Sequence, residues 1–83
     1  HLSPNHITMI HDIDAIGLIC PLPILKLRKV LQTVPAGEQV HILADDPVAV
    51  VDIPHFCQTN GHQHVETHDL AQGVKQFVII AGG

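Results

Sequence analysis

The chain has 83 residues, of which 46% are hydrophobic and only 2% aromatic, and its formal net charge at pH 7 is −4. The length predicts one domain over residues 1–83, and so few aromatic residues argue against a pocket for a large flat cofactor. The negative charge argues against direct nucleic-acid binding through the phosphates. No apolar run reaches the roughly 18 residues that indicate a membrane span.

The two cysteines, Cys20 and Cys57, bear on the compartment. They are too few for the disulfide framework of a small secreted domain, and neither lies in a CxxC pair of the kind used for redox chemistry or zinc binding. The first residues also lack the basic segment and apolar run of a secretion signal. A cytoplasmic protein is therefore expected, with both thiols reduced by default.

The first half of the chain is expected to form a strand and then a helix. Residues 1–6 are polar and interrupted by a proline, which is typical of a ragged terminus, and residues 7–13 carry the spaced apolar residues of a strand. Residues 21–34 have the period of an amphipathic helix, ended by the proline and glycine that follow. Leu25 falls among its polar residues and should face water. The side chains expected to pack inward are Ile24, Leu27, Leu31 and Val34.

The middle of the chain predicts a second strand and a second helical region. Residues 39–44 have the pattern of a strand, and the Asp-Pro pair that follows them signals the start of a helix. Pro54 should remove a backbone hydrogen bond and clash with the preceding turn. We therefore expect two short helical pieces, over about 47–52 and 54–60, with Asp52 capping the second.

The last third predicts two strands, over residues 62–67 and 74–80, joined as an antiparallel hairpin. The order of elements is then βαβαββ. This order predicts an α+β fold, with one four-stranded mixed sheet that carries both helices on one face.

Cys20 stands directly before two prolines at the predicted helix start and is the candidate reactive residue. At a helix N-cap the dipole and the unpaired N–H groups favour an anion, so a lowered thiol pKa is expected, and the thiolate is the nucleophilic form. Pro21 and Pro23 should fix the helix start, leaving the N–H group after each proline to contact the anion. Gly17 gives the preceding turn its freedom. From the residues alone, the simpler alternative is a buried structural thiol.

A basic cluster follows on the same predicted helix. Lys26, Arg28 and Lys29 carry most of the positive charge of the chain. Such a cluster is compatible with a solvated face, or with a docking patch for an acidic partner that also uses the neighbouring Leu25.

Three further groups have both a structural and a functional interpretation. Asp46 is most simply a helix cap, but the loops after parallel strands open at one edge of a sheet, so Asp45 and Asp46 should lie on the side of Cys20, within reach of a docking partner. Cys57 is either an inert core thiol or a resolving cysteine. The histidines at 62 and 64 share a strand face, but two ligands do not make a zinc site, and no metal is expected.

Several short motifs occur in a fixed order from about residue 12 to the end of the chain. They are Gly-Leu-x-Cys-Pro-x-Pro at 17–23, Asp-Asp-Pro at 45–47, Asp-Ile-Pro at 52–54, Phe-Cys at 56–57, Gly-His at 61–62 and the closing Gly-Gly at 82–83. In this combination the sequence resembles the TusA/SirA family. Leu22 stands where an acidic residue is frequent in the family, and Ile80 and Ala81 stand where basic residues are known; these departures concern the choice of partner.

The resemblance implies a two-layer α/β sandwich and a sulfurtransferase role. The cysteine matching Cys20 accepts a sulfane sulfur as a persulfide and passes it to the cysteine of a partner, in tRNA thiolation, molybdenum-cofactor synthesis or sulfur metabolism. The implied partners are a sulfur donor, such as a cysteine desulfurase or a rhodanese-like protein, and a downstream thiol acceptor. No cofactor is implied beyond the transient persulfide. The alternative is a non-catalytic binding or regulatory module, in which Cys20 is structural and the basic helix recognises the partner.

Overall fold

The computed structural model describes residues 9–82. Their main elements are β1 (Ile10–Ala15), α1 (Leu22–Leu31), β2 (Gln39–Ala44), α2 (Ala49–Thr59), β3 (Gln63–Asp69) and β4 (Lys75–Ile80), with one turn of 3₁₀ helix between the last two strands. This order confirms the predicted βαβαββ arrangement. The expected ragged terminus and the first two residues of the first predicted strand lie outside the described residues.

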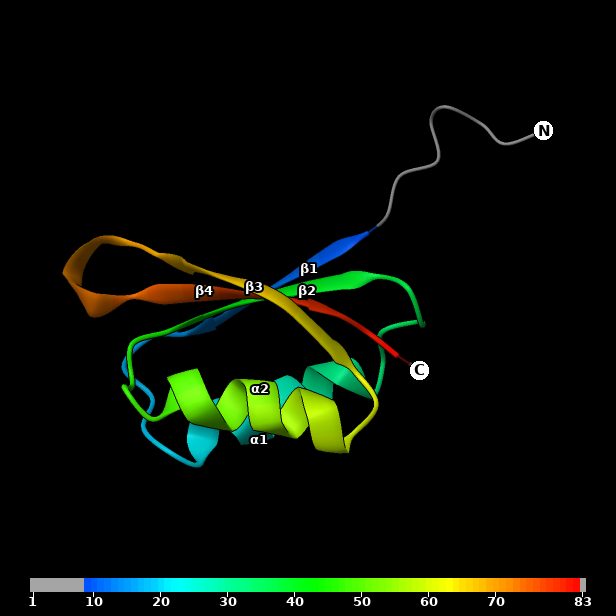
Figure 1. Ribbon diagram of the computed structural model, residues 1–83, viewed down its shortest axis with the longest axis horizontal. Helices are drawn as coiled ribbons and strands as arrows, with labels where there is room; N and C mark the ends of the chain where they lie inside the picture. The colour runs from blue at the N-terminus through cyan, green and yellow to red at the C-terminus, as the bar shows by residue number, and fades with distance from the viewer. Residues whose placement is uncertain (1–8, 83) are drawn as a thin grey trace.

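The four strands form one mixed sheet in the order β1-β2-β4-β3. β1 and β2 are parallel and are connected through α1, as parallel neighbours must be connected by a crossover. β4 is antiparallel to both of its neighbours, which confirms the predicted hairpin of β3 and β4. Both helices cover the same face of the sheet (Figure 1), so the two-layer α+β architecture is confirmed.

The core lies between this sheet and the two helices. Along β2 the residues alternate between half-buried and buried, with Val40, Ile42 and Ala44 turned to the helices. Such alternation is what a strand with one covered face requires. The core side chains that meet there from other elements are Leu27 and Leu31 of α1, Ile53 and Cys57 of α2, and Phe77 and Ile79 of β4.

Packing of α1 agrees with its predicted faces. Leu27, Leu31 and Val34 are buried, while Ile24 is half-buried and packs against the edge of the core. Leu25 is 51% exposed, as predicted. The helix ends at Leu31 instead of reaching Val34, because the N–H groups of Thr33 and Val34 bond to carbonyls three residues back and tighten the chain into a turn.

α2 is one helix, so the predicted division into two pieces at Pro54 is wrong. Ala49, Ile53 and Cys57 are spaced at helical intervals on both sides of the proline, and all three are buried. Tertiary packing of such a stripe stabilises a helix more than one missing backbone bond destabilises it. Because the helix is continuous, Asp52 lies in its first turn and caps no second piece.

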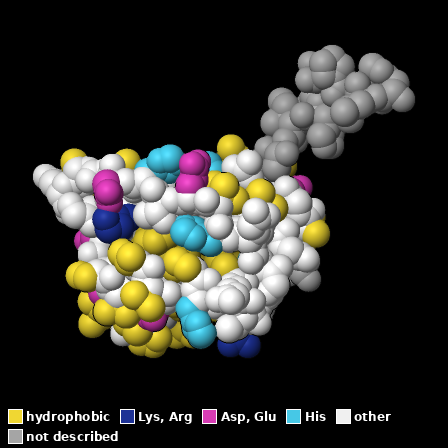
Figure 2. Space-filling view, in the orientation of Figure 1, with side chains coloured by type: hydrophobic (Ala, Val, Ile, Leu, Met, Phe, Trp, Pro, Cys, Tyr) yellow, Lys and Arg dark blue, Asp and Glu magenta, His cyan; other side chains and the backbone are white. Residues whose placement is uncertain are grey.

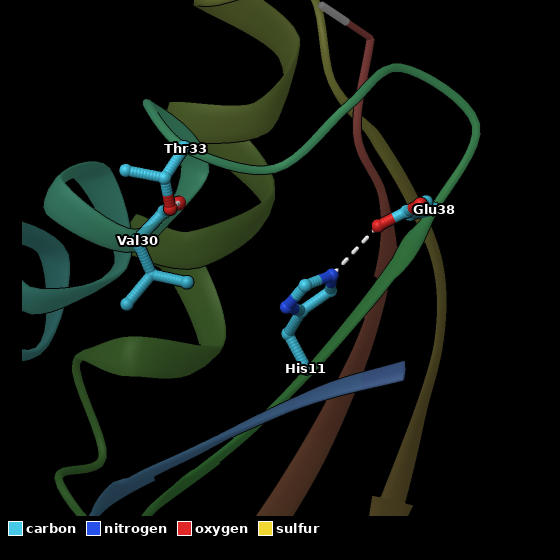
Figure 3. A network of polar contacts seen from close by, with 4 residues as sticks. All are labelled: His11, Val30, Thr33 and Glu38. Atoms are coloured by element: carbon cyan, nitrogen blue, oxygen red, sulfur yellow. Dashed lines mark hydrogen bonds and ion pairs between the residues drawn. The ribbon is translucent and has the colours of Figure 1, made fainter. Parts of the chain in front are cut away.

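Two polar contacts fix the ends of elements at the side of the molecule shown in Figure 3. The ring Nε2 of His11 on β1 lies 2.8 Å from Oε1 of Glu38, directly before β2, and so ties together the beginnings of the two parallel strands. The hydroxyl of Thr33 donates to the Val30 carbonyl at 2.8 Å, which satisfies a carbonyl at the end of α1.

The end of the chain packs against the turn between α2 and β3. A Cβ on Gly82 would lie only 1.6 Å from the carbonyl oxygen of Gly61, so no side chain fits there. The N–H of Gly82 donates to Nδ1 of His62 at 3.0 Å. Gly82 and the Gly-His motif therefore meet in one close contact.

α1 has 10 residues and α2 has 11, whereas about 20 are needed to cross the hydrocarbon of a bilayer. Within residues 9–82, no helix is long and apolar enough to span a membrane.

Candidate functional site

Cys20 lies in the loop between β1 and α1, at the end of the molecule where the parallel strands finish and both helices begin (Figure 1), and it is exposed. The structure moves it out of the predicted capping position, because α1 begins at Leu22 with Pro21 as the N-cap. The N–H of Leu22, expected to contact an anion, instead donates to the carbonyl of Ile19 at 2.8 Å. The helix start therefore stabilises the thiolate of Cys20 less than the sequence indicates.

Two aspartates hold the loop that carries Cys20. Oδ2 of Asp46 accepts the backbone N–H of Cys20 at 2.7 Å, and its Oδ1 accepts the N–H of Val48 at 3.1 Å. Oδ1 of Asp45 accepts the N–H of Gly17 at 2.9 Å. The prediction that both aspartates lie on the side of Cys20 is confirmed. Asp46 also stabilises the turn that leads into α2, so its structural and site roles coincide.

Asp52 makes the contact with the Cys20 sulfur. The thiol donates to Oδ2 of Asp52, and the Sγ–Oδ2 distance is 3.3 Å. This hydrogen bond raises the pKa of the Cys20 thiol above its ordinary value, and reduced hydration and the negative charges of Asp52 and Asp46 add to the rise. The expected lowering of this pKa is therefore wrong, because the hydrogen bond to Asp52 and the nearby negative charges raise it.

Sequence analysis missed the role of Asp52. Asp52 lies in the first turn of α2, beside the loop of Cys20. This placement follows only when α2 is one continuous helix, whereas the sequence predicted a break at Pro54. The Asp-Ile-Pro motif was the available signal, but it was interpreted as a cap.

Exposed apolar side chains surround this end of the molecule. They come from the loop of Cys20 and from the beginnings of both helices, and we call them the apolar rim: Ile16, Ile19, Leu22, Leu25, Val48 and Val51. Ile19 and Val51 are the most exposed, at 70% and 69%. Figure 2 shows hydrophobic side chains gathered at this end. Contiguous exposed apolar surface is typical of a protein-interaction site, and of the rim only Leu25 was predicted.

The structure does not keep the basic cluster together as one patch. Nζ of Lys26 donates to the backbone carbonyl of Asp14 at 2.6 Å, which ties α1 to the end of β1. Arg28 and Lys29 lie in the last turn of α1, where cations interact favourably with the helix dipole. Arg28 lines a hollow between the ends of the two helices with His62. These two charges therefore lie toward the end of α1 opposite to Cys20.

The second cysteine and the histidine pair have structural surroundings. Cys57 is 1% exposed, and burial raises the pKa of its thiol to about 11, which confirms the prediction of an inert core thiol. His62 stacks on Phe56, and His64 contacts the hydroxyl of Thr67. Among residues 9–82, no group of three or more potential ligands is placed to hold a metal ion.

Comparisons with known proteins agree with this fold. Residues 11–80 match the family described as sulfurtransferase TusA. A proposed sulfur carrier protein of Archaeoglobus fulgidus is 43% identical over 68 residues, which cover 82% of this chain and 88% of that protein. The crystal structure of a SirA-like protein from Desulfitobacterium hafniense superposes with a TM-score of 0.76 at 32% identity, covering 90% of this chain and 100% of that one.

The family match and the sulfur-carrier relative place this small two-layer α+β protein in the class of sulfur carriers. The chain belongs to the TusA family. The resemblance noted from its motifs is confirmed.

Proposed function

We propose that this protein accepts a sulfane sulfur as a persulfide on Cys20 and transfers it to the cysteine of a partner protein. The observation that carries the proposal is the exposed thiol of Cys20, at the family's motif position and within the apolar rim. The exposure of this side chain also disfavours the alternative in which Cys20 is a buried structural residue. Membership of a sulfur-carrier family supports the chemistry.

Sulfur transfer of this kind is thiol–disulfide exchange with one partner a persulfide. The Cys20 thiolate attacks the outer sulfur of the donor's persulfide, the new S–S bond forms as the donor's S–S bond breaks, and the donor's sulfur leaves as a thiolate that takes up a proton. In the second exchange an acceptor thiolate attacks the outer sulfur on Cys20, and the Cys20 thiolate leaves. No external oxidant or reductant is needed, and no metal or organic cofactor takes part.

The partners are other proteins that carry reactive thiols. The donor is a cysteine desulfurase or a rhodanese-like protein, and the acceptor belongs to a sulfur-relay pathway such as tRNA thiolation. We place the exchange in the reducing cytoplasm, where the thiol of Cys20 stays available between rounds.

Mass spectrometry of the intact protein tests the persulfide directly. After incubation with a persulfide donor, the wild-type chain should gain about 32 Da, one sulfur atom, and reductant should remove it. Cys20→Ser should abolish the gain, whereas Cys57→Ser should keep it because Cys57 is buried. Sulfur that appears on Cys57 and survives loss of Cys20 would show the assignment to be wrong.

The apolar rim supplies the docking surface in this proposal, because any partner thiol that reaches Cys20 must lie against it. Ile19→Asn should slow transfer from a protein donor about tenfold, the size of effect expected for a central interface residue. The matched control is Leu70→Asn, a similar change at an exposed residue of the β3–β4 connection. Equal transfer rates for the two variants would show that the apolar rim is not part of the docking surface.

The basic and acidic docking candidates contribute less in this arrangement. Arg28 and Lys29 can contact only a partner that extends along α1, so reversing both to Glu should slow transfer mainly at low salt, since exposed charges are screened. Lys75→Glu, on β4, changes the net charge by two units and is the control for each single reversal, Arg28→Glu and Lys29→Glu. Asp45 and Asp46 act on docking through the loop that they hold. Salt-independent loss in the double reversal would contradict a screened docking role.

A further inference from the structure

The thiol of Cys20 faces a carboxylate, although exchange requires a thiolate. Asp52 approaches it from the first turn of α2, half-buried, with Oδ2 at 3.3 Å from Sγ. A carboxylate that accepts the thiol proton and carries a negative charge stabilises the protonated form over the thiolate. In the free protein this contact therefore favours the less reactive, protonated form of Cys20.

The other charged groups near this loop have different contacts. Asp46 binds the backbone N–H of Cys20 and adds its negative charge. Asp45 binds the N–H of Gly17, and the ammonium of Lys26 is directed to a backbone carbonyl at the end of β1. In the part of the chain that the structure describes, Asp52 is the one charged side chain hydrogen-bonded to the Cys20 sulfur.

We propose that Asp52 is a positioning residue that holds the unloaded Cys20 as a protonated thiol, and that a docked partner frees the thiolate by breaking the Sγ–Oδ2 contact. The inference rests on the proposed function, since it concerns the same sulfur. Its consequence is selectivity: the free carrier reacts slowly with small persulfides and oxidants, and reacts fast with a protein that seats on the apolar rim and displaces the contact. On release the thiol proton passes to water, and the thiolate then attacks the outer sulfur of the donor as described above.

The geometry explains why docking would have this effect. Asp52 and Cys20 belong to different segments, 32 residues apart in the chain, and the thiol is the single hydrogen-bond donor recorded for the Asp52 carboxylate within residues 9–82. Cys20 lies in a loop, and the side chains beside it in the rim, Ile19 and Val51, are largely exposed. A partner that covers these two side chains contacts both segments, so a small movement of either one separates sulfur from carboxylate.

Alkylation of Cys20 across a pH series tests the proposal without any sulfur donor. Rates with iodoacetamide are read at the Cys20 peptide by mass spectrometry for the wild type and for Asp52→Asn, which keeps the size of the side chain and removes its charge. The variant should titrate at lower pH. For each unit by which the thiol pKa falls, the thiolate fraction at pH 7 rises about tenfold and the nucleophilicity of the thiolate falls about threefold. The alkylation rate should therefore rise about threefold per unit. The same ratio is expected for loading from glutathione persulfide.

Asp12→Asn is the control, because it removes one negative charge from an exposed residue of β1 that does not hold the Cys20 loop. Its alkylation profile should coincide with that of the wild type. A midpoint for Asp52→Asn equal to or above the wild-type midpoint would overturn the proposal, and so would an equal shift in Asp12→Asn. Failure of the persulfide proposal is a separate result, because it would appear as no mass gain on Cys20 whatever the alkylation profiles show.

Discussion

The two hydrogen bonds of Asp46 allow the stability of the Cys20 loop to be tested quantitatively. Asp46→Ala removes the acceptor of the Cys20 N–H at 2.7 Å and of the Val48 N–H at 3.1 Å. A hydrogen bond to a charged group contributes about 1.5–3 kcal/mol net to folding. A side-chain cap of a helix start, such as Asp46 provides to the N–H of Val48, contributes about 0.5–2 kcal/mol. Asp46 is only half-buried, so water replaces part of both, and the lower ends together give a loss of about 2 kcal/mol.

Urea unfolding followed by circular dichroism at pH 7, with reductant present, measures this loss. In a domain of this size 2 kcal/mol corresponds to a fall in melting temperature of about 8–16 °C. Asp46→Asn keeps an acceptor oxygen and should lose less than half as much, and Asp45→Ala, with one exposed bond to Gly17, should lose about 0.5–1 kcal/mol. If Asp46→Ala unfolds within 0.5 kcal/mol of the wild type, roughly the effect of an ordinary surface change, the loop is held by something else.

Two further predictions concern the ends of the core. Gly82→Ala should destabilise the fold by about 3 kcal/mol in thermal unfolding, because the new Cβ would clash with the backbone carbonyl of Gly61. Gly73→Ala is the control: its Cβ meets open space and only the positive φ is unfavourable, so it should lose about 1 kcal/mol. Equal losses in the two variants would refute the clash. Burial raises the pKa of Cys57 to about 11, above its unfolded value, so the stability that depends on its protonated form is present below about pH 8.5 and is lost as the pH rises through 11, by up to about 3 kcal/mol. Urea midpoints of wild type and Cys57→Ala should therefore converge between pH 8 and 11, and parallel curves would contradict this assignment.

The parts of the fold that could be predicted from sequence are those with a local cause. β2 was predicted to the residue because a short, mostly apolar run lies between the proline and glycine that end the first helix and the Asp-Asp-Pro at 45–47. The inward face of α1 followed from the spacing of its leucines. α2 was divided wrongly because the effect of Pro54 is local, whereas the gain from packing its buried stripe on the sheet depends on where the sheet lies.

The site was predictable in position and wrong in electrostatics. The two aspartates after β2 were correctly placed on the side of Cys20, since the edge of a parallel pair of strands brings their loops together, although Cys20 lies one residue before the helix cap that it was expected to occupy. Predicting the contact between Asp52 and the Cys20 sulfur would have required the exact start of α2 and the way this helix packs against the loop. No spacing rule gives the distance between two side chains from such segments, and that distance decided the direction of the pKa shift.

The burial of Cys57 determines how cargo can leave this carrier. Where two surface thiols of one chain meet, the second can attack the persulfide on the first, closing a disulfide and releasing the sulfur as hydrogen sulfide. This sequence has only two cysteines, and the second is enclosed in the core. Under the proposed function, a sulfur atom held on Cys20 would therefore have no exit within its own molecule, and the time it stays bound would be set by the molecules that the carrier meets.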